Sequence, residues 1–256
     1  MSYRHIAYAA AFGALVTASL PARAGEPRAV IELFTSQGCS SCPPADRVLG
    51  ELAHDPSLIT MSLPVDYWDY LGWKDTLALH GHANLQRAYA NARGVGEIGT
   101  PQALINGTAA VLGSDKDAIE QAIARSRQNA APLTLPVSMN VADGKVTVTV
   151  PAASVDGVVA EVWLCPITGK AEVKIGRGEN RGRTLTYTNV VRRWVKLGEW
   201  TGKAQTFTVP VADLADADFS LPDIDRLDVI VQRGVAAKPG LMLGAATLAL
   251  PPLVVR

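Results

Sequence analysis

The feature that most constrains the fold of this chain is a pair of cysteines, Cys39 and Cys42, in the stretch TSQGCSSCPP. Residues 29–34 (AVIELF) form a nearly continuous apolar run, which is typical of a buried strand. Residues 45–53 have apolar side chains at helical spacing, and the two prolines before them suit a first helical turn, where missing N–H donors cost little. The cysteines are therefore expected where a buried strand ends and a helix begins.

The chain continues this alternation of strands and helices to about residue 130. Apolar runs bounded by turn residues predict strands, and apolar residues at helical spacing after Ser114 or Asp115, either of which can cap a helix, predict a last helix. The predicted elements are a strand at 58–65, a helix at 75–93, a hairpin with strands at 102–106 and 108–112, and a helix at 116–128. The predicted order in residues 27–130 is thus β-α-β-α-β-β-α.

The cysteine pair is compatible with three kinds of site, of which a redox centre is favoured. A structural disulfide across three residues would close a very small loop and constrain the unfolded chain little. A zinc site needs two further ligands and no second Cys-x-x-Cys is present, while haem attachment needs a histidine where Pro43 stands. A thiol–disulfide exchange centre needs one attacking thiolate and one resolving thiol. A helix N-terminus would lower the pKa of Cys39 and make it the attacking group.

Longer motifs point to a known fold. The predicted order of elements, with Cys-x-x-Cys opening the first helix and Thr100-Pro101 opening the hairpin, resembles the thioredoxin superfamily in its minimal, glutaredoxin-like form. The finer signature is similar to a family of secreted bacterial proteins of unknown function. It comprises ELFTSQGCSSCPPAD at 32–46, VDYWDYLGWKD at 65–75, TPQALING at 100–107 and RGENRGRTLTYTNVVR at 177–192.

This resemblance implies roles for individual residues. Cys39 would attack a substrate, and Cys42 would resolve the mixed disulfide. Pro101 would follow a cis peptide bond against the cysteines, and the backbone of Thr100 would bind an extended substrate segment. Glu32 would be a buried acid that accepts the proton of the resolving cysteine, with a pKa raised by desolvation. An ordinary trans proline and an outward or salt-bridged glutamate are the alternatives.

The segment at 65–75 interleaves aromatic and acidic side chains. The strand before it is expected to end at the same sheet edge as the strand before Cys39. Asp66 and Trp68 are therefore candidates for a rim that shapes a substrate groove beside the cysteine pair. A packed loop that helps to dock the second domain is the alternative.

Two histidines raise the possibility of a metal site. His80 and His82 could join Cys39 and Cys42 in binding copper, since thiolate and imidazole ligands suit that metal. Thioredoxin-like copper-delivery proteins space their cysteines Cys-x-x-x-Cys, however, and histidines near a helix start are more often solvated. The redox interpretation requires no cofactor.

Residues 132–256 are expected to form a separate, all-β domain. Alternating residues and turn pairs predict several short strands, which favours a β-sandwich. These strands are predicted at 146–150, 158–164, 171–175, 185–197, 206–209, 227–232 and 241–250. Cys165 is expected to be a buried free thiol, or else a relay partner of the first pair. The basic stretch 177–183 is either a contact with a partner or the first domain, or a salt-paired surface.

The N-terminus predicts export. Residues 1–24 contain a short basic region, an apolar stretch at 6–20 and the small-x-small sequence ARA, which together are typical of a cleaved signal peptide. The apolar stretch is shorter than the ~20 residues that span a bilayer, so no stable membrane insertion is expected after cleavage. A formal net charge of +0 argues against nucleic-acid binding.

The sequence therefore predicts a thioredoxin-like α/β domain followed by an all-β sandwich-like domain, in a periplasmic or secreted thiol–disulfide oxidoreductase. Its expected substrates are cysteine pairs of other exported proteins, and a membrane or periplasmic redox partner would recycle it. A copper-binding thioredoxin-like protein and a non-enzymatic adaptor are the alternative functions.

Overall fold

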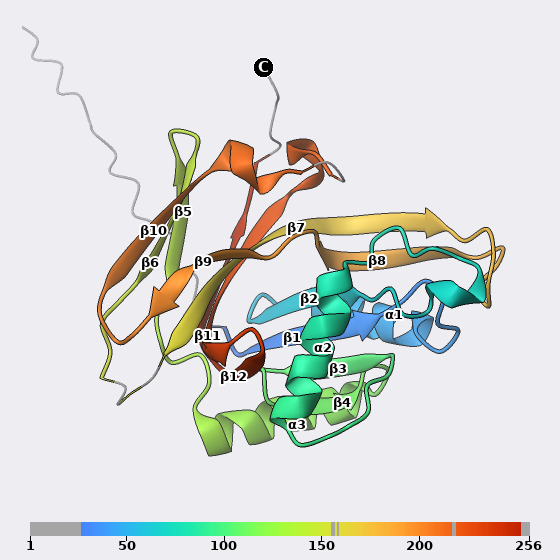
Figure 1. The fold of residues 1–256 in the computed structure, drawn as a ribbon, viewed down its shortest axis with the longest axis horizontal. Coiled ribbons are helices and arrows are strands. Elements are labelled where there is room, and N and C mark those ends of the chain that lie inside the picture. Colours follow the sequence, from blue (N-terminus) through green and yellow to red (C-terminus); the bar gives the residue numbers. More distant parts are fainter. Residues whose placement is uncertain (1–26, 155–156, 158, 217–218, 252–256) are drawn as a thin grey trace, which may run out of the picture.

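The computed structural model of the protein describes residues 27–154, 157, 159–216 and 219–251, so the predicted signal peptide lies outside the described residues. Strands form a nine-stranded mixed sheet and a three-stranded antiparallel sheet (Figure 1). Within the described ranges, no helix combines the length and apolar character needed to cross a membrane.

The elements of the first half are β1 (Ala29–Thr35), α1 (Pro43–Leu52), β2 (Leu58–Pro64), a 3-10 turn η1 (Asp69–Leu71), α2 (His80–Ala92), β3 (Gln102–Ile105), β4 (Ala109–Leu112) and α3 (Lys116–Ala130). Their order is the predicted one. Helix α3 begins as expected, because the Asp115 carboxylate accepts a hydrogen bond from the Ala118 amide. Helix α2 begins at His80 rather than Asp75, because the Asp75 carboxylate binds the backbone amides of Gln37 and Leu77 in a loop.

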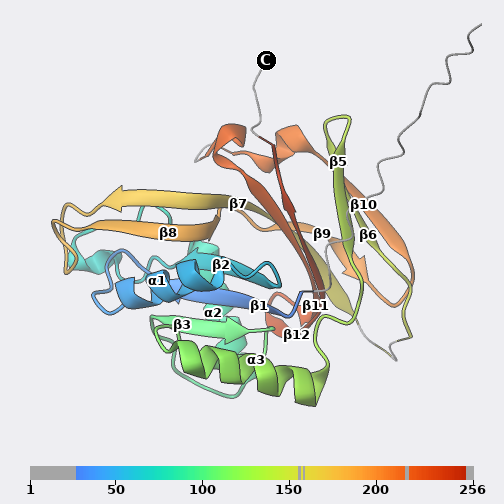
Figure 2. The same ribbon diagram turned by 180° about the vertical axis from the view of Figure 1, so that it is seen from behind.

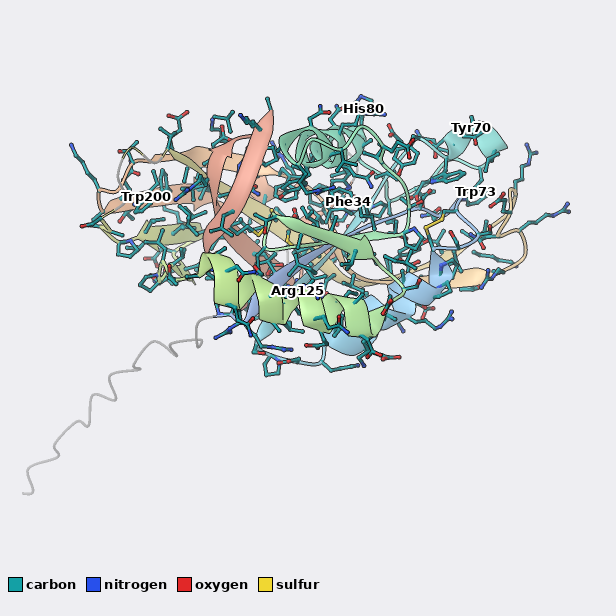
Figure 3. The ribbon with its side chains drawn as sticks, turned by 90° about the horizontal axis from the view of Figure 1, so that it is seen from below. Phe34, Tyr70, Trp73, His80, Arg125 and Trp200 are labelled. Atoms are coloured by element: carbon teal, nitrogen blue, oxygen red, sulfur yellow. A yellow bond between two sulfur atoms is a disulfide. The ribbon has the colours of Figure 1, made fainter. Side chains whose placement is uncertain are left out.

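The first-half strands lie in the order β2-β1-β3-β4. Strand β1 pairs in parallel with β2 and antiparallel with β3, and β3 pairs antiparallel with β4. Alternate residues of β1 pack in different clusters. Ile31 and Leu33 contact α1 and α3, whereas Val30 and Phe34 pack with Tyr89 of α2. Helices α1 and α3 therefore cover one face of the sheet, and α2 covers the other. Figure 3, in which the molecule is seen from below, shows α3 lying along the sheet.

The second half contains β5 (Ser138–Ala142), β6 (Lys145–Val150), β7 (Ala160–Lys174), β8 (Thr184–Val191), β9 (Val195–Trp200), β10 (Gln205–Pro210), the 3-10 turns η2 (Val211–Leu214) and η3 (Leu221–Asp223), β11 (Arg226–Val235) and β12 (Lys238–Ala249). Strand β7 unites two predicted strands, while the run predicted at 185–197 is divided between β8 and β9. The turn at Asp143-Gly144, with φ of 51° and 70°, joins β6 to β5, a strand that the sequence analysis did not predict.

The main sheet continues across the predicted domain boundary. Strand β8 pairs in parallel with β2 at Ser62 and Val190, and β7, β11 and β12 follow in that order. The three-stranded sheet packs against β7 and β11, so two sheets do face each other in the second half. One of these two sheets is nevertheless the nine-stranded sheet, which also contains the strands of the first half. Figures 1 and 2 show the β7–β8 hairpin running beside β2 and reaching past α1.

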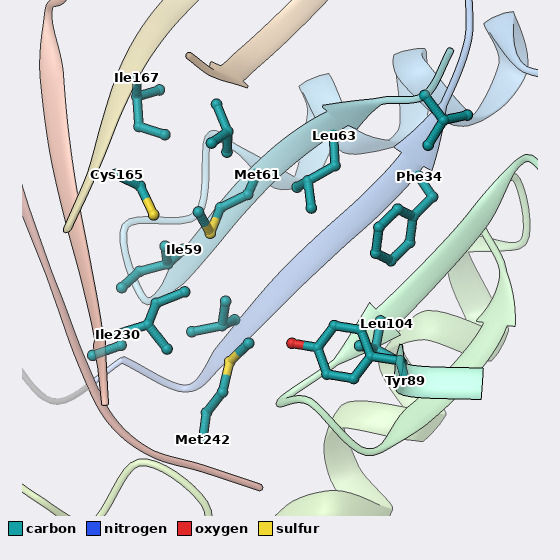
Figure 4. Close-up of a cluster of buried hydrophobic side chains, with 14 of the residues drawn as sticks. Phe34, Ile59, Met61, Leu63, Tyr89, Leu104, Cys165, Ile167, Ile230 and Met242 are labelled. Atoms are coloured by element: carbon teal, nitrogen blue, oxygen red, sulfur yellow. The ribbon is translucent and has the colours of Figure 1, made fainter. Parts of the chain in front are cut away.

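One apolar core is shared by both halves (Figure 4). Its first-half members include Phe34, Met61 and Tyr89. Its second-half members are Cys165, Ile167, Val191, Ile230, Met242 and Ala245. The buried amide of Gln232 also donates a hydrogen bond to the hydroxyl of Tyr89, at 2.8 Å. The two halves therefore shield each other's apolar surface from water.

Candidate redox site

Cys39 and Cys42 form a disulfide at the start of α1. Cys42 is the N-cap residue of the helix, and Cys39 lies three residues earlier, with a distance of 5.4 Å between the two Cα atoms. Cys39 is 2% exposed and Cys42 is fully buried, while the serines between them face solvent. Cys39 is therefore the slightly more accessible of the two cysteines. Figure 3 shows the disulfide as a yellow bond near Trp73.

The loop before β3 lies against the disulfide. The Thr100-Pro101 peptide bond is cis, as the sequence analysis expected. The Thr100 carbonyl oxygen is 3.7 Å from the sulfur of Cys39, and the hydroxyl of Ser41 is 3.3 Å from the same sulfur. An open groove beside this loop is lined by residues 99–102 and 110–112. The groove is thus joined to the disulfide through Thr100, which lines the one and lies against the other.

Aromatic side chains also lie against the disulfide loop and Thr100. Trp68 donates a hydrogen bond from its indole nitrogen to the Thr100 hydroxyl, at 2.8 Å. It also packs so closely on Gly38 that a Cβ atom there would lie 2.9 Å from the Trp68 Cβ. Tyr70 stacks on Trp68 with ring centroids 6.3 Å apart and is 77% exposed. Trp68 therefore lies against the disulfide loop, whereas the Asp66 carboxylate is hydrogen-bonded to the His80 ring at 2.8 Å.

A buried carboxyl group lies on the same helix as the disulfide. Asp46 follows Cys42 by four residues, and its amide donates to the Cys42 carbonyl, so the two side chains share a helix face. Its Oδ1 accepts a hydrogen bond from the Thr35 hydroxyl at 2.8 Å, and its Oδ2 has no hydrogen-bond partner in the described part of the chain. Burial raises the pKa of Asp46 to about 7. Asp46 can therefore exchange a proton near neutral pH.

Asp46 interacts electrostatically with two further buried polar groups, Asp75 and Tyr187. Burial raises the pKa of Asp75 to about 6, although the amides of Gln37 and Leu77 favour its ionised form. The negative charge of Asp75 in turn favours the protonated form of Asp46. The Tyr187 hydroxyl, from β8, is buried, and its pKa is raised first by burial and then by these two carboxylates. The two carboxyl groups of the first half therefore interact with each other and with the tyrosine hydroxyl that the second half places beside them.

Glu32 lies elsewhere. It is fully buried, and it occupies the face of β1 that α2 covers, where it interacts with Tyr89. Burial raises the pKa of Glu32 to about 8, and the Tyr89 hydroxyl offsets this only in part. Glu32 is therefore buried, as predicted, and burial raises its pKa in the predicted direction. Helix α1 and the buried side chain of Asp46 lie on the opposite face.

The tip of the β7–β8 hairpin holds the disulfide loop. Asn180 is fully buried, and its side-chain amide donates to the carbonyl oxygens of Gln37, at 3.0 Å, and Cys39, at 2.9 Å. The carboxylate of Glu179 accepts a hydrogen bond from the Ser40 amide at 3.1 Å. The basic stretch 177–183 therefore contacts the first half of the chain, one of the two outcomes that the sequence left open.

The histidines of the copper alternative have other partners. His80 is exposed and pairs with Asp66, whereas His82 is buried, with its Nδ1 2.8 Å from the Pro64 carbonyl oxygen. Burial lowers the pKa of His82 to about 4. Throughout the described ranges, no group of three or more His, Cys, Asp or Glu side chains is placed to hold one metal ion. Cys165 is buried and free, as predicted, and burial raises its pKa well above the usual range.

Three residues that meet at this site were not predicted from the sequence, namely Asp46, Glu179 and Asn180. Asp46 had a local signal, because a residue four positions after Cys42 must share its helix face. The other two lie in the stretch 177–183, for which a contact with the first domain was one expectation, but nothing local pairs them with cysteines about 140 positions earlier.

Known proteins are similar to this chain over most of its length. A family model described as "Protein of unknown function (DUF1223)" matches residues 30–232. A protein of Agrobacterium tumefaciens, whose X-ray structure was determined in a structural genomics programme, is similar to this chain with 29% sequence identity and a TM-score of 0.76. The similarity covers 90% of this chain and 97% of the bacterial one. No curated protein matches the chain.

Proposed function

We propose that this chain, which belongs to the DUF1223 family, is a thiol–disulfide oxidoreductase that works through Cys39 and Cys42. The observation that carries the proposal is the position of the disulfide, at the start of α1 and against the backbone of a cis Thr100-Pro101 bond. A disulfide used only as a staple would gain little from closing so short a loop. The order of elements in residues 29–130 further supports a thioredoxin-like first domain.

The exchange reaction moves two electrons and two protons. In the reduced protein, the thiolate of Cys39 attacks one sulfur of a substrate disulfide, and the other substrate sulfur leaves with the electron pair and takes up a proton. Cys42, once deprotonated, then attacks Cys39, which breaks the mixed disulfide and releases the second substrate thiolate. The substrate disulfide is thereby reduced to two thiols, and the Cys39–Cys42 disulfide is formed. Oxidation of a substrate dithiol is the same sequence in reverse.

Asp46 is the group that we assign to the proton of Cys42. It shares a helix face with that cysteine, it is buried, and one of its oxygens has no competing partner within the described residues. A carboxyl group whose pKa is near neutrality can accept a proton at one step and return it at the reverse step. Glu32, the residue predicted for this role, faces α2 instead, and its part in proton transfer stays a prediction.

The substrate is proposed to bind as an extended segment over Thr100 and Pro101, with Trp68 at its border. The Thr100 backbone lies beside Cys39, and the groove next to it is open. Substrates would be cysteine pairs of other exported proteins, in the periplasm or outside the cell, and a membrane or periplasmic redox partner would recycle the pair. This location rests on the signal-like sequence of residues 1–24.

The proposal is tested with Cys39→Ser and Cys42→Ser in the mature chain. Reduced wild-type protein should reduce a protein disulfide, Cys39→Ser should lose this activity, and Cys42→Ser should accumulate a mixed disulfide with the substrate. Cys165→Ser is the matched control, because it removes a thiol that lies buried away from the pair. Activity that persists in Cys39→Ser would exclude an exchange centre here and favour an adaptor.

A further inference from the structure

The start of α1 offers few hydrogen-bond donors to a thiolate at Cys39. The first two helical residues are Pro43 and Pro44, which have no N–H group. The Cys42 amide donates to the Cys39 carbonyl oxygen at 3.3 Å. Donors at a helix N-terminus are the main reason that such cysteines become thiolates easily. At this helix, most of those donors are missing or already used.

The Ser40 amide is one of the remaining donors, and it is occupied by a residue of the second half. The Glu179 carboxylate accepts its hydrogen bond at 3.1 Å. A carboxylate in this position has two effects on a neighbouring thiolate: it takes the N–H group, and it adds a like charge. Both effects disfavour the thiolate relative to the thiol.

Glu179 is held there by rigid neighbours. Asn180 is fully buried and donates two hydrogen bonds to the disulfide loop. The Arg183 guanidinium donates to Asn180 Oδ1 at 2.8 Å. The indole of Trp73 packs on Gly176, where an added Cβ atom would lie 2.8 Å from the ring, and it donates to Gln37 Oε1 at 2.8 Å. The hairpin tip is thus fixed on both sides of Glu179.

We propose that Glu179 is a positioning residue that biases the Cys39–Cys42 pair toward its disulfide form, so that the protein acts as a reductant of disulfides. A pair becomes a strong oxidant when its reduced form is stabilised as a thiolate. Glu179 instead destabilises the thiolate, so it favours the disulfide over the reduced form. The inference rests on the proposed function and specifies its substrates as oxidised cysteine pairs of exported proteins. The electrons would come from the dithiol of a redox partner, which is itself oxidised to a disulfide.

Other charges near the loop contribute to the same balance. The Asp46 and Asp75 carboxyls lie beneath the loop, and Arg183 approaches it from the hairpin. The Ser41 hydroxyl, 3.3 Å from the Cys39 sulfur, is a donor that would favour the thiolate. None of these groups is altered when Glu179 is replaced by glutamine, which keeps the shape of the side chain and removes its charge.

The test compares wild type, Glu179→Gln and Glu172→Gln as reduced and oxidised full mature proteins. Glu172 is the matched control, because it is an exposed glutamate of the same hairpin that pairs with Lys170. Equilibration in buffers of reduced and oxidised glutathione gives the stability of the disulfide. The pH dependence of iodoacetamide labelling at Cys39 gives the pKa of its thiol.

We expect Glu179→Gln to be reduced at a lower ratio of reduced to oxidised glutathione, with an equilibrium constant shifted by about threefold or more. The midpoint of the pH dependence of Cys39 labelling should move to lower pH. Glu172→Gln should match wild type in both measurements. Unchanged equilibrium and labelling in Glu179→Gln would overturn the inference, even if Cys39→Ser still abolishes exchange. A different outcome is that Glu179→Gln shifts the equilibrium constant and the labelling pH, but the wild-type protein reduces no protein disulfide. The proposed function and the assigned substrates would then be wrong.

Discussion

Burial sets the chemistry of Asp46, a carboxyl group one helical turn beyond Cys42. We expect Asp46→Asn to slow the resolving step roughly tenfold or more, because asparagine cannot accept the proton of Cys42. The mixed disulfide should therefore accumulate, and the dependence of its decay on pH near 7 should disappear. Stopped-flow mixing of reduced protein with a disulfide substrate, followed by acid quenching, measures this decay. Asp117→Asn, at an exposed site, is the control.

The same substitution should change how stability depends on pH. The pKa of Asp46 is about 7 in the folded protein against an ordinary 3.8, so the folded state favours the protonated acid. Its contribution is fully present below pH ~4 and is lost as the pH rises to ~7. Asp46→Asn should match wild type at pH 4 and exceed it at pH 8, by at most about 4 kcal/mol. Urea unfolding of the oxidised proteins at both pH values measures the difference, and equal values at pH 8 would contradict it.

At the scale of elements, the β7–β8 hairpin acts as a support for the disulfide loop. Its side-chain amide at Asn180 donates to the buried carbonyl oxygens of Gln37 and Cys39, the second of which also accepts from the Cys42 amide. We expect Asn180→Ala to lower the free energy of unfolding by about 1–3 kcal/mol, since the Gln37 carbonyl oxygen would lose its donor and a buried unsatisfied group costs about 1–3 kcal/mol. Urea unfolding of the oxidised protein measures this loss. Asn84→Ala, on an exposed face of α2, should leave the midpoint unchanged.

The loop itself reports on the same contact. Without the Asn180 amide, the segment from Gln37 to Cys39 should open more often, so reduced Cys39 should be labelled faster by iodoacetamide. Labelling as slow as in wild type, together with an unchanged unfolding midpoint, would show that the hairpin does not support this loop.

At the scale of the whole molecule, the shared core predicts that the first half cannot fold alone. Its α2 face packs on Ile230, Met242 and Ala245, all of which follow residue 131. A fragment of residues 27–131 would expose this apolar face and leave the outer edge of β2 unpaired. We expect it to unfold without a cooperative transition or to aggregate, as circular dichroism and gel filtration would show. The full mature chain is the control, and a cooperative monomeric fragment would contradict this expectation and support the two-domain division predicted from sequence.

The sequence alone determined the local part of this protein. The strand at 29–35, the two prolines that open α1 and the turn at Asp143-Gly144 depend on residues close together in the chain. Such features follow from periodicity, proline geometry and turn preferences, which neighbouring residues decide. The placement of the cysteines between a strand and a helix was predictable for that reason.

Only the tertiary structure decided which distant groups meet at the disulfide. Strand order and register bring β8 beside β2 and carry the tip of its hairpin to Cys39. Glu32 lies under α2 because its side chain is on the α2 face of β1. Asp46 shares a helix face with Cys42 because it follows that residue by one helical turn. These choices depend on how apolar faces from both halves are buried together, a free energy summed over the whole core. No short stretch of sequence contains that sum.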